Sequence, residues 1–371
     1  MKGYSHIIST NRADLSLLYN LIFLLESDKS ITSKVIFAGE ITGEKEYIKT
    51  YFPVINKDFI GKKLTYSSIH NLAKQSNEIA IAYSEYLSKN KKPDYIICLG
   101  DRYELLNLLQ IATLNRIPIV HIHGGDKTYG ALDNEIRYAI SKLAKLHCTA
   151  TRLSKNNLIM AGEEEWRIKV VGAPGRDILK KYIKTVERNE LYNKFNIKSS
   201  RFAFVAYHPE TFENKNNSIA DIVINPLLEE GLYPIVSRPN PDPFGDIIRE
   251  ELKSFHDKHK IILLDTSIGP KYMCSIMEQA EIMVGNSSSG IIEASLFDLP
   301  VINIGSRQSG RQIDSNVISV NDNRDNIKKI ISRFAGKKIK ITKSVYEHGN
   351  VAENIYKHIS KNINNLNKNK N

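Results

Sequence analysis

The sequence predicts an α/β protein with two halves, each built around a parallel β-sheet. Short apolar runs alternate with helical stretches along most of the chain, and this alternation restarts after a polar helical stretch at roughly Asp177–Phe195. The chain of 371 residues is also long for a single hydrophobic core. Ligands of such sheets bind beyond the carboxyl ends of the strands, so the residues that follow each strand are the candidates for function.

The expected strands of the first half are, in chain order, YSHIIS, KVIFAG, YIICLG, PIVHIHG, KLHCTAT and KVVGAPG. The helical stretches between them include LSLLYNLIFLLES and HNLAKQSNEIAIAYSEYLSK. The second half repeats the pattern with RFAFVAYHP, YPIVSRP, KIILLD, EIMVGN and VINIG, followed by helices at about Arg324–Phe334 and Ser344–Lys361. We therefore expect a first domain at residues 1–176, a second at 177–343, a C-terminal helix at 344–361 that packs back across the domains, and a disordered polar tail at 362–371.

The composition is typical of a soluble globular protein without structural disulfides. Hydrophobic residues make up 42% and charged residues 25% of the chain, and its 3 cysteines are too widely spaced for a disulfide framework or a metal site. The net charge of +11 is spread along the chain, which argues against nucleic-acid binding and favours an anionic substrate only in a general way. No segment reads as a membrane span or a signal peptide, so we expect a cytoplasmic protein without a membrane partner.

The segment Ile282–Arg311 carries the strongest indication of function. A short buried strand ends in the turn GNSSSG, a helix begins there, and the strand VINIG follows. The first N–H groups of a helix suit a phosphate, the glycines allow close backbone approach, and the serine hydroxyls add donors. Glu293 lies about one turn further on, placed for ribose hydroxyls, and Arg307 and Arg311 follow the next strand. A serine-capped helix of an ordinary α/β domain is the alternative, but the acid and the two arginines favour a nucleoside diphosphate site.

Several strands of the chain end in polar side chains. The residues that follow the first, third and fourth strands are Thr10, Asn11, Arg12 and Asp14; Asp101, Arg102 and Glu104; and His123, Asp126, Asp133, Glu135 and Arg137. Ordinary structural alternatives are an Asp101 that caps its helix and pairs with Arg102, and histidines that are satisfied core residues. Because His121 and His123 alternate onto one face beside two glycines and three acids, we favour a functional cluster. In the second half, His208 follows a strand and is expected to face the first half across a cleft.

The motifs at these positions resemble those of the UDP-N-acetylglucosamine 2-epimerase family. They read TNRAD, GDRYE, HIHGGDKT, LDNEIRYAISKLAKLH, VVGAPGRD, YHPET, GNSSSGIIEAS and INIGSRQSGR, and they occur in the family's order over about residues 10 to 311. The double glycine favours the hydrolysing branch, which begins the synthesis of sialic and related nonulosonic acids, because the non-hydrolysing branch typically reads HVEAGLRT there. The resemblance implies two Rossmann-like domains that face a cleft, as in GT-B glycosyltransferases, with UDP held mainly by the second.

The activity implied by the resemblance is cleavage of UDP-N-acetylglucosamine to N-acetylmannosamine and UDP. The C2 hydrogen of this substrate is not acidic, so the C1–O bond to UDP must break before or together with proton loss. The product of this elimination is a 2-acetamidoglycal, to which water adds with inverted configuration at C2. Such a site needs donors for the departing diphosphate, carboxylates beside the ring and a base at C2.

Carried over motif by motif, the resemblance places four residues on the diphosphate: Arg12, Ser287, Ser288 and Arg307. It places Glu293 on the ribose. It places Asp101, Asp133 and His208 among the catalytic groups, to which we add His123, Asp126 and Glu135. Further predicted contacts to the substrate or UDP are Asp14, Arg102, Arg137, Asn240, Asn286 and Arg311. With no metal-ligand cluster and no GxGxxG fingerprint, the sequence predicts neither a metal nor a cofactor. We expect a homo-oligomer, a dimer or a tetramer, with a UDP-sugar as its ligand.

Two positions depart from the family's pattern. His123 stands where many members carry a glutamate, although some enzymes of sialic-acid pathways also read HIHGG. Asn134 stands where most members have the second of two adjacent acids, and Asn cannot act as a base. Either Glu135 takes that role through a local shift, or Asp101 and Asp133 carry it, or the reaction differs. The alternative functions are the same chemistry on a UDP-2,4-diacetamido-trideoxyhexose, a non-hydrolysing epimerase, a GT-B glycosyltransferase and a non-catalytic nucleotide-sugar sensor.

Overall fold

The computed structural model describes residues 3–64, 68–129, 132–208, 218–239, 245–258, 260–264 and 268–367. The chain forms two compact units. The first contains residues 1–126, 133–177 and 346–371, and the second contains residues 127–132 and 178–345. The short segment 127–132 belongs to the second unit. The chain is therefore not divided by one boundary between residues 176 and 177.

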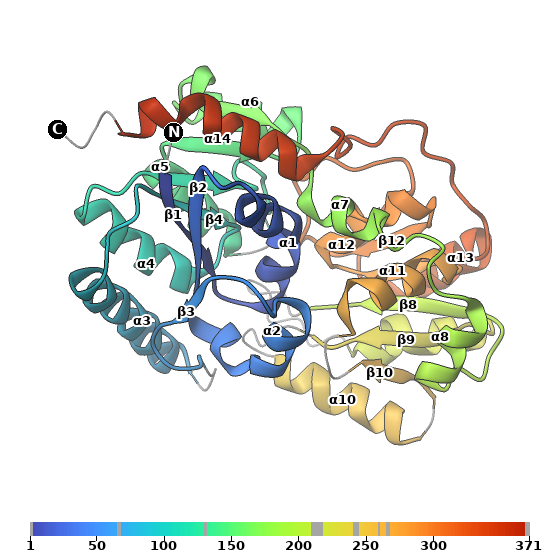
Figure 1. Ribbon diagram of the computed structural model, residues 1–371. Helices are drawn as coiled ribbons and strands as arrows, with labels where there is room; N and C mark the ends of the chain where they lie inside the picture. Colours follow the sequence, from blue (N-terminus) through green and yellow to red (C-terminus); the bar gives the residue numbers. More distant parts are fainter. Residues whose placement is uncertain are drawn as a thin grey trace. The chain divides into compact units, whose positions relative to one another are not determined.

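The first unit is a parallel sheet covered by helices on both faces (Figure 1). Its strands lie in the order β3-β2-β1-β4-β5-β6-β7, and the described pairings are parallel. Consecutive strand residues pack in opposite cores: Ile7 packs with α1 and α14, whereas Ile8 packs with α3 and α4. Burial on both faces explains why these strands are apolar runs rather than alternating ones.

The strands of the first unit are β1 (Gly3–Ser9), β2 (Ile31–Phe37), β3 (Lys57–Phe59), β4 (Tyr95–Leu99), β5 (Ile119–Ile122), β6 (Leu146–Thr149) and β7 (Ile168–Val170). Its helices are α1 (Arg12–Ser27), η1 (Gly39–Gly43), α2 (Lys45–Tyr51), α3 (Ile69–Lys89), α4 (Tyr103–Leu114), α5 (Asp133–Leu143), α6 (Arg152–Met160), η2 (Glu165–Arg167), α7 (Pro174–Lys180) and α14 (Val351–Asn367). Helix α7 begins in this unit and continues into the second.

The second unit contains a second parallel sheet, with the strand order β10-β9-β8-β11-β12-β13. Its strands are β8 (Phe202–Ala206), β9 (Tyr233–Ser237), β10 (Ile262–Leu264), β11 (Met283–Gly285), β12 (Val301–Ile304) and β13 (Val317–Val320). Its helices are α8 (Arg188–Phe195), η3 (Ala220–Ile224), α9 (Asn225–Glu229), α10 (Gly245–Asp257), α11 (Gly269–Gln279), α12 (Ser288–Ile292), η4 (Ala294–Phe297) and α13 (Arg324–Phe334). In the described parts of the chain, none of the helices combines the length and apolar character needed to cross a bilayer.

The C-terminal helix differs from the prediction at both ends. It begins at Val351 rather than Ser344, because Gly349 has a φ of +77° and Asp177 Oδ2 accepts hydrogen bonds from the first N–H groups of the helix. It also continues to Asn367, so the tail expected to be disordered from residue 362 is helical over most of its length. Ile363 and Leu366 are buried in the core of the first unit, which accounts for the extension.

Candidate functional site

The carboxyl end of β1 leads into α1 through Thr10 and Asn11, which surround the side chain of Asp14. Asn11 caps the helix, since its side-chain oxygen accepts a hydrogen bond from the Asp14 N–H at 2.8 Å. The Thr10 hydroxyl and the Asn11 amide both donate to Asp14 Oδ2, at 3.2 and 2.9 Å. Burial raises the pKa of Asp14 to about 7, although the nearby charge of Arg102 opposes this effect. Asp14, a predicted substrate contact, is therefore a buried acid at the start of α1.

The end of β4 carries an arginine that pairs with an acid of its own helix. Arg102 Nε donates to Glu104 Oε1 at 3.3 Å, and the guanidinium lies 4.7 Å from the centre of the Tyr103 ring. The Glu104 carboxylate is completely buried. Arg12, at the start of α1, lies 3.8 Å from Glu44. The structural alternative predicted Asp101 as the cap of α4; the N-cap residue is Arg102, and Asp101 accepts a hydrogen bond from Arg137.

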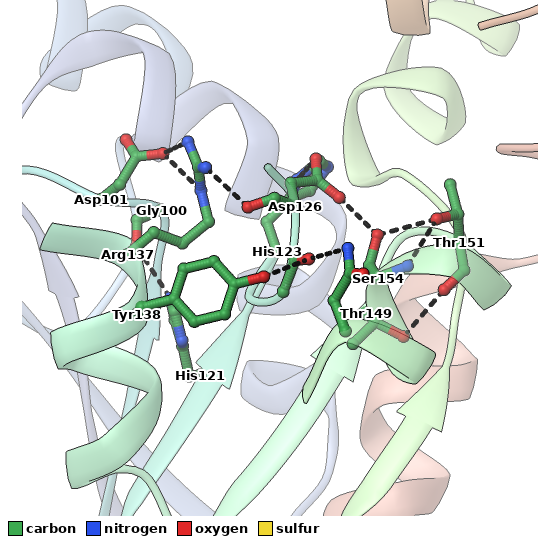
Figure 2. Close-up of polar contacts among 12 residues, drawn as sticks. Gly100, Asp101, His121, His123, Asp126, Arg137, Tyr138, Thr149, Thr151 and Ser154 are labelled. Atoms are coloured by element: carbon green, nitrogen blue, oxygen red, sulfur yellow. Dashed lines mark hydrogen bonds and ion pairs between the residues drawn. The ribbon is translucent and has the colours of Figure 1, made fainter. Parts of the chain in front are cut away.

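The partner of Asp101 is a fully buried arginine on α5. Arg137 Nε donates to Asp101 Oδ2 at 2.9 Å, a second guanidinium nitrogen contacts the same oxygen, and the third donates to the Asp126 carbonyl at 2.9 Å (Figure 2). Burial by itself would lower the pKa of Arg137, but the charges of Asp101 and Asp126 raise the pKa above its usual value. Arg137, which was predicted to contact the substrate, has 1% of its side chain exposed and links the residues that follow β4 and β5.

A neutral histidine on β5 links the residue that follows β4 to helix α5. His121 Nε2 lies 2.8 Å from the Gly100 carbonyl, which can only accept, so this nitrogen carries the proton. Its Nδ1 therefore accepts from the Ser141 hydroxyl, at 3.0 Å. Burial lowers the pKa of His121 to about 4. A Cβ at Gly124 would lie 2.8 Å from both His121 and Ser141, so a larger residue does not fit above this pair.

The loop after β5 holds the polar side chains His123 and Asp126. His123 has a φ of +68°, which a histidine adopts at an energetic cost, and such strain is common at functional sites. Its Nδ1 lies 3.6 Å from Asp126 Oδ2, and the other carboxylate oxygen of Asp126 accepts from the Ser154 hydroxyl of α6 (Figure 2). Gly125 has a φ of +82°, and a Cβ there would lie 2.3 Å from the Ser154 carbonyl. The loop thus packs directly on the first turn of α6.

The first turn of helix α5 contains Asn134, one of the two positions that depart from the family pattern. Asp133 is the first residue of the helix and is partly buried, whereas Glu135 is exposed. The Asn134 amide lies 3.5 Å from Glu135 Oε1, at the surface. Asp133 contributes to the electrostatic field at Arg137, so it lies on the side of the helix that carries the buried cluster.

In the second unit, the glycine–serine turn is anchored to the end of β8. Gly285 has a φ of +147°, and a Cβ there would lie 2.0 Å from the Ala206 carbonyl. The Asn286 side chain accepts from the His208 N–H at 2.7 Å and donates to the His208 carbonyl at 2.9 Å. Asn286, which was predicted to contact UDP, is completely buried and fixes the backbone of His208. Burial, with Arg307 adding to the effect, lowers the pKa of His208 to about 3, so its imidazole is neutral.

The predicted nucleotide residues follow this turn. Ser287 caps α12, and its hydroxyl oxygen accepts from the N–H and hydroxyl of Ser289 at 3.4 and 3.0 Å. The helix is shorter than predicted: α12 ends at Ile292, Glu293 follows it, and a 3₁₀ turn continues over η4. Arg307 Nη1 lies 3.5 Å from the Asn286 carbonyl.

Ser288, Glu293 and Arg311 are each partly exposed on the segments after β11 and β12. Asn240 lies outside the described residues. The described residues contain no group of three or more His, Cys, Asp or Glu side chains that could hold a metal ion.

Some residues of these clusters were not predicted. Ser141, Ser154 and Asn157 bond to the β5 strand and its loop, and Gln308 donates to the Asn286 carbonyl at 2.9 Å. A signal existed for Ser154 alone, because Thr151 ends the run KLHCTAT and Ser154 follows three residues later, which is the spacing of a helix cap. The other contacts depend on tertiary packing.

The fold and the clusters define a class of proteins: two parallel-sheet α/β units, with acids and histidines at the strand ends of one unit and a glycine–serine turn in the other. Within this class, the chain belongs to the UDP-N-acetylglucosamine 2-epimerase family, whose model matches residues 24–360. The family suggested by the motifs is therefore confirmed.

Two relatives match most of the chain. The GDP/UDP-N,N'-diacetylbacillosamine 2-epimerase (hydrolyzing) of Campylobacter jejuni is 33% identical over 327 residues, covering 85% of this chain and 84% of that protein. The UDP-N,N'-diacetylbacillosamine 2-epimerase (hydrolyzing) of Legionella pneumophila is 31% identical over 364 residues, covering 94% and 93%.

The fold is shared with a solved structure of the family. The UDP-GlcNAc 2-epimerase of Methanocaldococcus jannaschii, in complex with UDP-GlcNAc and UDP, matches with a TM-score of 0.80 at 22% identity, covering 97% of this chain and 100% of that one. The predicted fold class, α/β with two parallel-sheet domains, is confirmed.

Proposed function

We propose that this chain is a hydrolysing 2-epimerase that cleaves a UDP-linked 2-acetamido sugar to UDP and the free sugar inverted at C2. The observation that carries the proposal is the cluster around Arg137, which holds the Asp101 carboxylate next to the loop of His123 and Asp126. Family membership and two relatives named as hydrolysing 2-epimerases support the reaction class. We keep the expectation of a cytoplasmic homo-oligomer as part of this proposal.

The proposed reaction has two stages. In the first, the C1–O bond breaks, its electron pair leaves with UDP, and a base removes the C2 proton, giving a 2-acetamidoglycal. In the second, a proton adds to C2 from the opposite face, and water adds to C1 and loses a proton to solvent. Because removal and return occur on opposite faces, the site needs two acid–base groups on different elements.

The first unit offers these groups. Two N–H groups of the buried Arg137 fix the direction of the Asp101 carboxylate, so Asp101 is suited to stabilise positive charge at the ring. We assign the base function at C2 to Asp101 together with Asp133. His123, which stands where many family members have a glutamate, is the second acid–base group and returns a proton to C2.

The second unit supplies the nucleotide contacts in this proposal. Ser287, Ser288 and Arg307 bind the diphosphate, and Glu293 accepts hydrogen bonds from the ribose. Their support is the anchored turn, in which Gly285 and Asn286 fix the backbone before Ser287. His208 is neutral there and is suited to donate or accept a hydrogen bond rather than to carry a charge.

The substrate we favour is UDP-N,N'-diacetylbacillosamine, a UDP-2,4-diacetamido-trideoxyhexose. The Campylobacter jejuni and Legionella pneumophila relatives carry this substrate in their names. UDP-N-acetylglucosamine, the substrate first predicted from the motifs, is the second candidate, because the Methanocaldococcus jannaschii structure contains it.

Purified protein should be incubated with each sugar nucleotide separately, with and without EDTA, and the products followed by phosphorus and proton NMR. We expect UDP and a free C2-inverted sugar, faster release from the diacetamido substrate, and equal rates in EDTA. A C2-inverted sugar that stays attached to UDP indicates the non-hydrolysing reaction. Transfer to an added acceptor indicates a glycosyltransferase, and binding without turnover a sensor.

A further inference from the structure

The first turn of α6 donates a chain of hydrogen bonds to the loop after β5. The Ser154 N–H donates to Thr151 Oγ1 at 3.1 Å, and the two hydroxyl oxygens lie 2.7 Å apart. Ser154 gives its single hydroxyl proton to Asp126 Oδ1, so the proton between the two hydroxyls belongs to Thr151. All donors therefore point in one direction, from the helix backbone to the carboxylate of Asp126, and such chains polarise one another.

The same turn also fixes the backbone of the loop. Asn157 Nδ2 donates to the Gly125 carbonyl at 2.9 Å, and Gly125 packs on the Ser154 carbonyl too closely for any Cβ. Thr151, Ser154 and Asn157 are each at most 4% exposed. The carboxylate of Asp126 is thus held on one side by buried groups that do not reach solvent, and its other oxygen lies toward His123.

The geometry points to Ser154 as a positioning residue that orients Asp126 so that the carboxylate sets the tautomer of His123. A carboxylate oxygen can only accept, so Asp126 Oδ2 selects the tautomer with a proton on Nδ1. Nε2 then takes up a proton from solvent, and the imidazolium, stabilised by Asp126, returns that proton to C2. The separation of 3.6 Å is longer than a hydrogen bond, and catalytic hydrogen bonds commonly tighten when the substrate binds. This inference rests on the proposed function, which uses His123 as an acid–base group.

The positive φ of His123 fits this role. Its N–H donates to the Cys148 carbonyl at 2.9 Å, so the backbone is held in the left-handed conformation that turns the ring back toward Asp126. Two residues later, Gly125 repeats a positive φ and brings the chain onto α6. The loop therefore depends on α6 for its conformation and for the orientation of its acid.

The test compares Ser154→Ala with Ser154→Thr, which retains the hydroxyl, and with a matched control, Ser76→Ala. Ser76 is also buried in the first unit, and its hydroxyl donates to the Leu72 carbonyl within α3 at 2.9 Å. We expect Ser154→Ala to lower kcat roughly 10- to 100-fold with KM nearly unchanged, because a hydrogen bond to a charged group is lost. Ser154→Thr should restore most of kcat, and Ser76→Ala should turn over like the wild type. An equal loss in Ser154→Thr, or a rise in KM alone, contradicts the inference.

A double variant separates positioning from a structural effect. In a His123→Gln background, Ser154→Ala should cause little further loss, because the group that it orients is already absent. Independent, multiplicative losses contradict the inference.

The His123 ring gives a readout that does not depend on turnover or on the stability of a variant. In ¹⁵N-histidine-labelled wild-type protein with UDP bound, with the His123 signals assigned from His123→Gln, we expect the Nδ1–H tautomer. The Nε2–H tautomer overturns the inference even if Ser154→Ala fails to fold. If the wild type cleaves no UDP-sugar, the proposed function fails, whereas the ring still reports whether Asp126 sets the tautomer.

Discussion

In the first unit, the side chains after β4, β5 and β6 bond to one another, whereas in the second unit the groups after β8 and β11 are held mainly through backbone atoms. Arg137 pairs with the Asp101 carboxylate, and Ser154 donates to the Asp126 carboxylate. By contrast, Asn286 bonds to the His208 backbone, and Gln308 donates to the Asn286 carbonyl.

This difference corresponds to two tasks of a nucleotide-sugar 2-epimerase, proton transfer and nucleotide binding. Fixing the direction of charged side chains prepares a site for proton transfer, since the transition state needs charges in defined positions. Fixing a backbone turn prepares a binding surface for a ligand whose shape does not change during the reaction. Substitutions in the first unit should therefore change turnover, and those in the second should change nucleotide affinity.

The largest effect is expected at Asp101. Asp101→Asn should lower turnover on the order of 100-fold or more, because the proposed base and the charge at the ring are removed together. UDP affinity, measured by calorimetry, should hardly change, since Asp101 does not contact the nucleotide in this proposal. A parallel loss of affinity and turnover would mean that the two units do not divide the tasks.

Glu293→Gln tests the second unit in the opposite sense. It should weaken UDP binding by roughly 1–3 kcal/mol, because a charge-assisted hydrogen bond to the ribose becomes a neutral one. Turnover at saturating substrate should be affected much less. Calorimetry with UDP and with free diphosphate provides the control: the loss should appear only for the ligand that contains ribose.

The burial of Asp14 in the first unit should make the free energy of unfolding depend on pH. The pKa of Asp14 is raised to about 7, so the unfolded chain loses this proton at lower pH than the folded one. The folded protein is therefore progressively destabilised as the pH rises from about 4 to 7. Asp14→Asn should remove this part of the pH dependence, on the order of 2 kcal/mol, in urea unfolding at pH 5 and pH 8. If the free energy of unfolding changes equally with pH in the wild type and in Asp14→Asn, the pKa of Asp14 is not raised by folding.

The smallest effect is expected at the surface of α5. Glu135 is exposed, so Glu135→Gln should leave turnover nearly unchanged, and Asn134→Asp should be tolerated or raise the rate. The choice between Glu135 and Asp101 as base, which the sequence left open, depends on this result. If Glu135→Gln abolishes turnover and Asp101→Asn does not, our assignment is displaced by one residue along the helix, a turn of about 100°.

Most of the fold was predictable because strands buried on both faces are apolar runs. Strand β13 (VISV) was not predicted although it is an apolar run. Two other exceptions have physical reasons. β3 is a short edge strand of Lys57, Asp58 and Phe59, which shows no apolar run. The end of α14 carries its buried face on widely spaced apolar residues among Asn and Lys, so composition alone suggested disorder.

Strand ends identified the region of the candidate site but not the role of each residue. Arg137 and Asn286 were expected to contact ligand, yet both are buried and hold other groups in place. Ser154 was missed because its contact with Asp126 joins residues 28 apart in the sequence. Residue type and spacing cannot tell whether a polar group meets a ligand or another side chain, because packing decides that.

The most direct test of the proposed elimination and hydration is the fate of the C2 hydrogen. The reaction should be run in D₂O with UDP-N,N'-diacetylbacillosamine, and the free sugar analysed by proton NMR and mass spectrometry. We predict one deuterium at C2 of the inverted sugar, since the proton removed in the first stage exchanges with solvent before a proton returns. Release of UDP with hydrogen retained at C2 would contradict the account.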